Sequence, residues 1–509
     1  MRQSIDPYTG RRINHVQNRR AFALIAFLTA LAATAASAQD KPPAQPPRYN
    51  VVIYLIDGVR ADHVGAYGYD KPTSPVLDAL AEKSVVFEQC SAPAPWSLPS
   101  VASVHTAKLS CDHGELHENE ELALNQPRLA PRARKAGFST ASFFTNPYSG
   151  PSIGLQKGFD EWAGMEVLDP GRVAAWLSAP SDKPRLLVLH DGNMRELADV
   201  DEQFVKPFGS VKAALRKQLP KLVNQYRQTL NSDFLNGKTR GSSKTFGKLR
   251  AYLRQFDEMK PRINTLYDAS LRETDHTVGL MIDALRKANL WDSTVFVLAG
   301  THGVALGEHD LWWEGQSVYD ELIHVPLIVH FPSDRDAGTR ITTPVSLVDI
   351  VPTVAEATGA DALKLDGAGR SLIPLLHADT EAQEEPMRVT SLRLNMRSWY
   401  RRSMRARGDH NVVVRDGMYK AIWNVQLDTV ELYDLRSDPG EEHDLHETET
   451  QRAEAMRAFA RTSVLDSIVR VTGTQSALLK SLDPETRRIL REAGVIQKNH
   501  KRGKKRKKP

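Results

Sequence analysis

Three short apolar runs of this 509-residue chain are each followed by side chains that can bind a ligand or move a proton. Asp57 follows the first run, His190 the second and Thr301-His302 the third. If these runs are parallel strands of one sheet, the polar residues lie together at its carboxyl edge, where open α/β folds bind their ligands. The sequence therefore predicts a candidate site at that edge.

The elements that would position these residues alternate between strands and helices. Tyr49–Ile56 is a continuous, largely β-branched run, which is typical of a strand buried on both faces. The further strand and helix candidates are Arg185–Leu189, Thr294–Leu298, Pro326–Phe331, Ser74–Glu82 and Leu266–Ala288. This alternation predicts an α/β sandwich with a mainly parallel central sheet. The charged stretch 191–260 contains no recognisable strand and is expected to be a helical insertion over the same edge.

The pattern changes after about residue 388, where three short runs are separated by turn residues. These runs are Asn411–Arg415, Met418–Trp423 and Thr429–Leu435, and they predict a small antiparallel sheet. The expected organisation is a signal peptide (1–38), a proline-rich spacer (39–48), an α/β domain (49–387), a β subdomain (388–450), a helical segment (451–497) and a basic tail (498–509).

The first 38 residues have the composition of an export signal. Arg19-Arg20 precede an apolar run, Ala21–Leu31, and the small residues up to Ala38 follow. The run is too short to span a bilayer comfortably, and no other stretch approaches the roughly 18 apolar residues that a spanning helix needs. We therefore expect an exported, periplasmic or secreted protein. The paired arginines fit either twin-arginine export or an ordinary charged leader.

The positive charge of the chain is concentrated at its two ends. Residues 1–38 contain five arginines and one aspartate, and residues 498–509 contain eight lysines and arginines, so the body between them is mildly acidic although the formal net charge is +5. This distribution excludes a dedicated nucleic-acid binder. The tail is expected to be disordered and either solubilises the chain or contacts anionic lipid or cell-surface polymer.

Cys90 and Cys111 are the two cysteines, and pairing between them is left open.

Several longer segments, in order and spacing, resemble bacterial sulfatases of the alkaline-phosphatase superfamily. They are Ile56–Tyr69, Thr73–Ala81, Pro95–Thr106, Gly303–Trp312, Tyr319–Glu321, Val325–Ile328, Val345–Thr353, Gly369–Leu372, Glu431–Leu435 and Asp438–Glu441. The resemblance covers about residues 50–450. It implies an α/β/α sandwich with a mainly parallel sheet and a small C-terminal antiparallel sheet.

The resemblance also implies displacement at the sulfur or phosphorus of an anionic ester, on a glycan or a lipid. A divalent metal would lower the nucleophile's pKa and neutralise the ester oxygens. Asp57 and His302 are the matching metal ligands, with calcium or magnesium expected first and manganese or zinc as alternatives. Where the family carries a carboxylate this chain has Thr301, which is a weak ligand for a hard cation. The metal site is therefore expected to be impaired, with Asp310, Glu308 and His309 left open as substitutes for the missing ligand.

Ser97 matches the position of the family's nucleophile, which is converted to formylglycine within a Cys/Ser-x-Pro-x-Arg signature. Val101 replaces the arginine, so we expect Ser97 to stay unmodified and to attack directly, which favours phosphoesters. The alternative is a serine that caps a helix starting near Pro99.

Three further residues match positions near the nucleophile. His190 is the candidate for assisting the leaving group, and Arg195, where a histidine is usual, is the candidate for binding the anionic ester. Arg60 is either an anchor for an ester oxygen or the partner of Asp62 in a salt bridge. Two hypotheses remain open: a metal-dependent sulfatase or phosphatase-type hydrolase, and an inactive relative that binds anionic ligands. A lectin-like binder of anionic glycans is a third. The oligomeric state is not predicted.

Overall fold

The computed structural model describes residues 49–114, 122, 126–151, 153–192, 194, 197–232, 243–377, 387–393, 410–425 and 427–472. Residue contacts divide the chain into two units, 1–45 and 46–509, and every described residue belongs to the second. The predicted signal peptide, the spacer and the basic tail lie outside the described residues, as does Arg195. Among the described helices, none is long and apolar enough to cross a bilayer.

An eight-stranded sheet forms the centre of the unit, with the order β11-β2-β10-β7-β1-β6-β4-β5. Its middle strand β1 (Asn50–Ile56) is buried at every residue and runs parallel to β6 (Arg185–Asp191) and β7 (Thr294–Gly300). The other strands are β2 (Val85–Phe87), β4 (Ser139–Phe144), β5 (Glu161–Gly164), β10 (Leu327–His330) and β11 (Arg340–Ile341). Only β10 is antiparallel to its neighbours, so the prediction of a mainly parallel sheet is confirmed.

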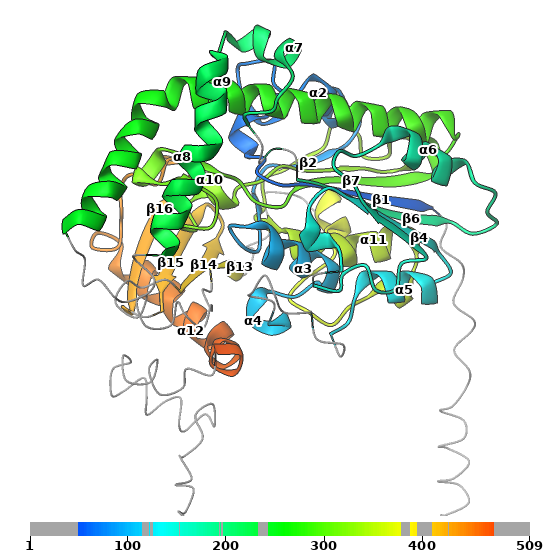
Figure 1. Ribbon diagram of the computed structural model, residues 1–509. Coiled ribbons are helices and arrows are strands. Elements are labelled where there is room, and N and C mark those ends of the chain that lie inside the picture. Colours follow the sequence, from blue (N-terminus) through cyan, green and yellow to red (C-terminus); the bar gives the residue numbers. More distant parts are fainter. Residues whose placement is uncertain are drawn as a thin grey trace, which may run out of the picture. The chain divides into compact units, whose positions relative to one another are not determined.

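The two faces of this sheet bury two separate apolar cores. Because side chains alternate along a strand, Val51, Ile53 and Leu55 of β1 enter one core, and Val52, Tyr54 and Ile56 enter the other. Figure 1 shows the covering helices. On one face they are α3 (Ser97–Thr106), α5 (Leu129–Lys135) and α11 (Ile350–Thr358), and on the other α2 (Pro75–Glu82), α6 (Pro170–Ser178) and α9 (Ser243–Lys287).

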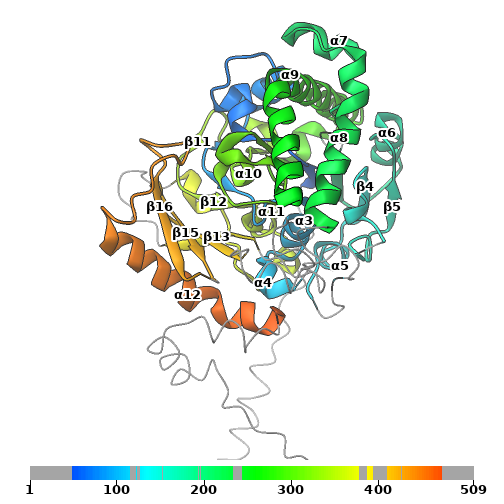
Figure 2. The ribbon, with the colours of Figure 1, turned by 60° about the vertical axis from the view of Figure 1, so that its left-hand side comes forward.

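The stretch between β6 and the second half of α9 contains helices joined by turns and irregular segments, with no strand among its described residues. It contains α7 (Glu202–Val205), α8 (Ala213–Ser232) and the first turns of α9. In Figure 2, α8 and the first half of α9 run side by side. Tyr226 of α8 meets Phe256 of α9 edge to face, with ring centroids 5.4 Å apart. The 45-residue α9 continues from this pair onto the face of the sheet.

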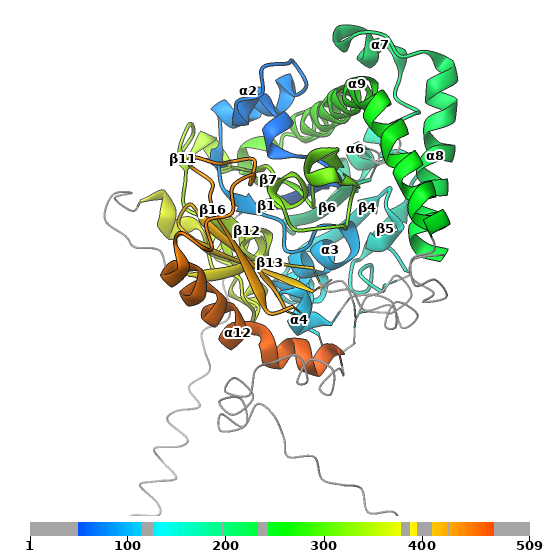
Figure 3. The same ribbon diagram turned by 90° about the vertical axis from the view of Figure 1, so that its left-hand side faces the viewer.

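A second, antiparallel sheet follows near the C-terminus, in the order β13-β14-β15-β16. Its strands are β13 (Arg388–Arg393), β14 (Asn411–Asp416), β15 (Tyr419–Asn424) and β16 (Thr429–Asp434). Gly417, with a φ of 57°, begins the two-residue turn between β14 and β15, where a left-handed conformation favours glycine. Helix α12 (Thr450–Thr472) packs along this sheet and closes a third core (Figure 3). This confirms the predicted small C-terminal antiparallel sheet.

Candidate active site

The carboxyl ends of β1, β6 and β7 bring four of the predicted residues together. Asp57 follows β1, His190 lies near the end of β6, and Thr301 and His302 follow β7. Since β1 lies between β6 and β7, their ends are adjacent. Helix α3 adds Ser97 as its first residue. All five side chains are buried, with exposures of 0 to 2%.

The carboxylate of Asp57 is at the centre of this group and accepts hydrogen bonds from four side chains of the described residues. Its Oδ1 accepts from His190 Nε2 at 2.9 Å and from the hydroxyl of Thr301. Its Oδ2 accepts from Ser97 Oγ at 2.9 Å and from the amide of Asn146. An ionised carboxylate has about four acceptor positions, and these four side chains fill them when the Ser97 proton points to Asp57. We call Asp57, Ser97, Asn146, His190, Thr301 and His302 the Asp57 cluster.

Ser97 is held between the carboxylate and an imidazole. Its Oγ lies 3.1 Å from His302 Nε2 as well as 2.9 Å from Asp57 Oδ2, and its single proton can point to only one of them at a time. The helix N-cap position belongs to Trp96, and Ser97 makes no capping contact there. The capping interpretation of Ser97 is therefore wrong, because its hydroxyl is directed into the cluster.

The tautomer of His302 follows from its other nitrogen. Nδ1 lies 2.7 Å from the carbonyl oxygen of Gly303, which can only accept, so Nδ1 carries a proton. In the neutral ring Nε2 is then an acceptor facing Ser97. Asp57 lies on this same side, with Oδ1 3.7 Å from Nε2. The group is thus a Ser–His pair oriented by a backbone carbonyl, and it differs from a Ser-His-Asp triad, in which the carboxylate binds Nδ1.

His190 has both ring nitrogens engaged. Nε2 contacts Asp57, and Nδ1 lies 2.6 Å from Ser149 Oγ. This geometry makes His190 a positioning residue for the carboxylate.

The cation predicted beside Asp57 is bound elsewhere. Arg60 donates from Nε and one terminal nitrogen to Asp62, at 2.9 and 2.7 Å, and from the other to Glu308 and the carbonyl of Val304. The Asp62 side chain is 56% exposed; its partial desolvation by the surrounding protein would raise its pKa, but Arg60 outweighs this and lowers the pKa to about 2. Of the two interpretations of Arg60, the salt bridge to Asp62 is the one found.

The loop that carries Asp57 is braced by α9. Tyr267 donates its hydroxyl to the carbonyl of Gly58 at 2.8 Å and accepts the amide of Arg60 at 3.0 Å. Its neighbour Asp268 accepts from His63 and Lys71 in the same loop region.

Two residues of the site were not found from sequence. Asn146 and Ser149 follow β4, the strand on the other side of β6. Thr145-Asn146 also directly follow a strand, as Asp57 does, but the polar composition of Ser139–Phe144, with two serines and a threonine, does not predict a strand there.

Cys90 and Cys111, both described and both buried, form no disulfide with each other.

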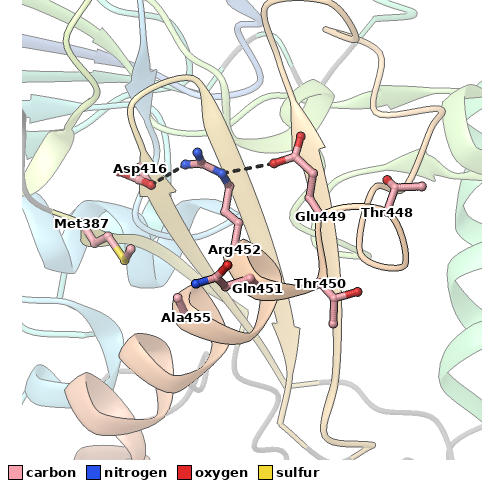
Figure 4. Close-up of a pocket in the computed structure, with 8 residues that line it drawn as sticks. All are labelled: Met387, Asp416, Thr448, Glu449, Thr450, Gln451, Arg452 and Ala455. Carbon is pink, nitrogen blue, oxygen red and sulfur yellow. Dashed lines mark hydrogen bonds and ion pairs between the residues drawn. The ribbon is translucent and has the colours of Figure 1, made fainter.

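A pocket of about 510 Å³ lies in the C-terminal sheet region (Figure 4). It is lined by Met387, Asp416, Thr448, Glu449, Thr450, Gln451, Arg452 and Ala455. Arg452 pairs across it with Asp416 at 2.9 Å and with Glu449 at 3.2 Å. The pocket shares no residue with the Asp57 cluster.

Comparisons with known proteins agree on one family. The profile described as Sulfatase matches residues 49–360, and that of the N-sulphoglucosamine sulphohydrolase C-terminal region matches residues 307–462. An ulvan-active sulfatase of Formosa agariphila is 25% identical over 67% of this chain and 68% of its own. A Delta 4,5-hexuronate-2-O-sulfatase of Bacteroides thetaiotaomicron is 23% identical over 90% of this chain and 95% of its own.

Solved structures share the fold. A 2-O GAG sulfatase superposes with a TM-score of 0.61 at 19% identity, covering 86% of this chain and 96% of its own. A phosphonate monoester hydrolase of Agrobacterium radiobacter does so with a TM-score of 0.61 at 18% identity, covering 83% and 96%.

Sulfatases generally use a divalent metal ion, and the residues present here do not fit one. The described part of the chain contains no group of three or more His, Cys, Asp or Glu side chains that could hold a metal. The predicted ligands Asp57 and His302 do meet, but Asp57 is the sole carboxylate of the cluster and accepts four hydrogen bonds.

Proposed function

Because this chain belongs to the sulfatase family, we propose that it is an ester hydrolase that cleaves an anionic sulfuric or phosphoric ester with the unmodified hydroxyl of Ser97. The observation that carries the proposal is the 3.1 Å contact between Ser97 Oγ and His302 Nε2. A nucleophilic hydroxyl within hydrogen-bond reach of an oriented base is the arrangement that covalent catalysis requires.

The reaction then has two steps. The hydroxyl proton of Ser97 passes to His302 Nε2 as Oγ forms a bond to the phosphorus or sulfur, and the bond to the leaving alkoxide breaks. Water then attacks the serine ester, releases the inorganic anion and returns the hydroxyl. His302 accepts a proton in each attack and gives it up to the alkoxide and to the regenerated Oγ. Asp57 fixes the position of Oγ, and His190 fixes Asp57.

The substrate proposed is an ester on a glycan. The relatives above are named as sulfatases of ulvan and of an unsaturated hexuronate. Val101 in place of the formylglycine arginine favours a phosphoester over a sulfate. Arg195, the predicted anchor for the anionic ester, stays a proposal. So do export through residues 1–38 and contact of the basic tail with anionic surfaces.

A second function is favoured by a different observation. Ser97 is only 2% exposed, and four side chains fill the acceptor positions of Asp57 when the Ser97 proton points to it. These features suit an inactive family member that binds an anionic glycan without cleaving it. The hydrolase and the inactive binder would share the same family fold, so only a measurement of turnover distinguishes the two proposed functions.

The test is an activity assay on the purified chain with aryl sulfate, phosphate monoester, phosphodiester and phosphonate monoester substrates. We expect hydrolysis of at least one phosphoester, and a loss of about 10²-fold or more in Ser97→Ala. Ser103→Ala is the matched control, since Ser103 is a buried serine of the same helix whose hydroxyl contacts His113. Turnover that is equal in native protein and Ser97→Ala, or absent with all substrates, contradicts the proposed hydrolase.

A further inference from the structure

We infer that the Asp57 carboxylate is coordinated by hydrogen-bond donors of this chain in place of a divalent cation, so that the folded site is metal-free. This inference deepens the proposed function by assigning the activation of Ser97 to His302 alone. It concerns the folded protein, however, and does not depend on turnover.

The donors around Asp57 are fixed from outside the cluster. The side-chain oxygen of Asn146 accepts the amide of Tyr148 at 2.9 Å, and this leaves its NH₂ group to face the carboxylate. His190 is held by Ser149 on its far side, and Thr301 is anchored by its amide, which donates to Ile56 at 2.8 Å. A cation at Asp57 would have to displace donors that their own neighbours hold in place.

The side chains facing Asp57 are also the wrong ligands for a hard cation. Calcium takes six to eight oxygen ligands, and magnesium takes an octahedral set of oxygens made up of one or two carboxylates, several waters and often a substrate phosphate. Here the partners are one amide NH₂, two hydroxyls and one imidazole nitrogen, that of His190. A threonine hydroxyl at position 301 supplies a proton where a carboxylate would supply charge.

Zinc has to be considered beside calcium and magnesium, because imidazole nitrogens are common zinc ligands. It would need Asp57, His190 and His302 as three ligands around one point. In a tetrahedral zinc site with bonds of about 2.0–2.1 Å, two ligand atoms lie about 3.3 Å apart. His190 Nε2 instead lies 2.9 Å from Asp57 Oδ1, within hydrogen-bond range, and His302 Nε2 lies 3.7 Å from the same oxygen, so the three groups do not have the spacing of a zinc tetrahedron. The described residues likewise contain no group of three or more His, Cys, Asp or Glu side chains that could hold a metal.

The first experiment measures cation binding without substrate. Native protein and Asp57→Asn are compared by thermal unfolding in EDTA and in millimolar Ca²⁺, Mg²⁺, Mn²⁺ or Zn²⁺. We expect both midpoints to change by the same amount with each cation. A native midpoint that rises by roughly 5 to 10 °C more than that of Asp57→Asn overturns the inference. If Asp57→Asn does not fold, equilibrium dialysis of native protein decides, since one cation retained per chain overturns the inference and none supports it.

The second experiment restores a ligand. Thr301→Asp replaces the donor by a second carboxylate against Asp57 Oδ1, and two like charges at this distance are relieved either by protonation of one of them or by a cation bound between them. We expect Thr301→Asp to gain a cation-dependent rise of its midpoint of roughly 5 °C or more, and the isosteric, uncharged Thr301→Asn to gain none. Native protein that responds to cations as strongly as Thr301→Asp overturns the inference. Loss of turnover with an unchanged cation response affects only the proposed hydrolase.

Discussion

Two polar clusters of this molecule stabilise buried charge in different ways. In the Asp57 cluster, one carboxylate is surrounded by hydroxyl, amide and imidazole groups. In the second, which we call the Lys420 cluster, the ammonium of Lys420 lies 2.6 Å from Asp320 Oδ1 and 2.8 Å from Glu441 Oε1. Lys420 is completely buried and belongs to β15, whereas Asp320 begins α10 (Asp320–Ile323).

The difference lies in what compensates the charge. Dipolar donors stabilise Asp57, and each can be lost without leaving a second charge behind. The Lys420 cluster pairs one cation with two carboxylates in a region from which water is largely excluded, and removal of the lysine leaves the carboxylates without a compensating charge. Burial raises the pKa of Glu441 to about 8, with Asp320 adding to the effect and Lys420 opposing it. Burial would also raise the pKa of Asp320, but Lys420 outweighs it and lowers that pKa.

The largest effect is expected for Lys420→Met. The change keeps the length of the side chain but removes the ammonium, and this leaves Asp320 and Glu441 buried side by side. We expect a loss of about 3 to 5 kcal/mol in the free energy of unfolding, measured by urea titration. Lys364→Met is the control, because Lys364 is exposed and its pair with Asp361 should contribute less than about 1 kcal/mol. A Lys420→Met protein as stable as this control would show that the triad is not a stabilising unit.

A smaller loss is expected for Asp57→Asn. The amide presents an NH₂ group to donors that previously faced an oxygen, so at least one buried hydrogen bond becomes a repulsive contact. The cost should be about 1 to 3 kcal/mol, again measured by urea titration. Asp182→Asn, at an exposed position, is the control. If the free energy of unfolding falls more in Asp57→Asn than in Lys420→Met, the proposed contrast between dipolar and ionic compensation is wrong.

Thr301→Val should lower the free energy of unfolding by less than Asp57→Asn does, because three donors to Asp57 remain. Valine has nearly the same shape but lacks the hydroxyl, so we expect a loss of about 1 kcal/mol. Thr301→Ser keeps the hydroxyl and serves as the control. Equal losses in the two variants would assign the effect to packing of the methyl group instead of the hydrogen bond.

The two clusters also differ in how far the sequence reveals them. Asp57, His190 and His302 were found because each follows an apolar run, and the family resemblance added Ser97. The direction of the Thr301 hydroxyl could not be predicted, since it depends on which acceptor the folded chain places beside it. Asp320, Lys420 and Glu441 lie in three separate segments with no common pattern. Only the pairing of β15 with its neighbours and the approach of α10 bring them together.

The smallest effect is expected from pH, and it comes from His309 beside the Lys420 cluster. A hydrogen bond to Glu321 raises the pKa of His309 from 6.5 to about 9, and its Nε2 lies 3.2 Å from the carbonyl of Glu441. A raised pKa means that the folded state binds the proton more tightly than the unfolded state. The stability from His309 is therefore complete below pH 6.5 and is lost as the pH rises through 9. Glu441 acts in the same direction, with a loss between 4.5 and 8.

We therefore expect the free energy of unfolding to fall between pH 6 and pH 9. The His309 part should be on the order of 1 kcal/mol, because this side chain is partly exposed and water screens it. Urea titrations at several pH values measure it. His309→Gln should flatten the decline above pH 7, whereas His443→Gln, at a largely exposed histidine, should not. Since the Asp57 cluster holds its charge with dipoles, Thr301→Val should leave the slope unchanged. A decline that persists in full in His309→Gln would assign the pH dependence to Glu441 alone.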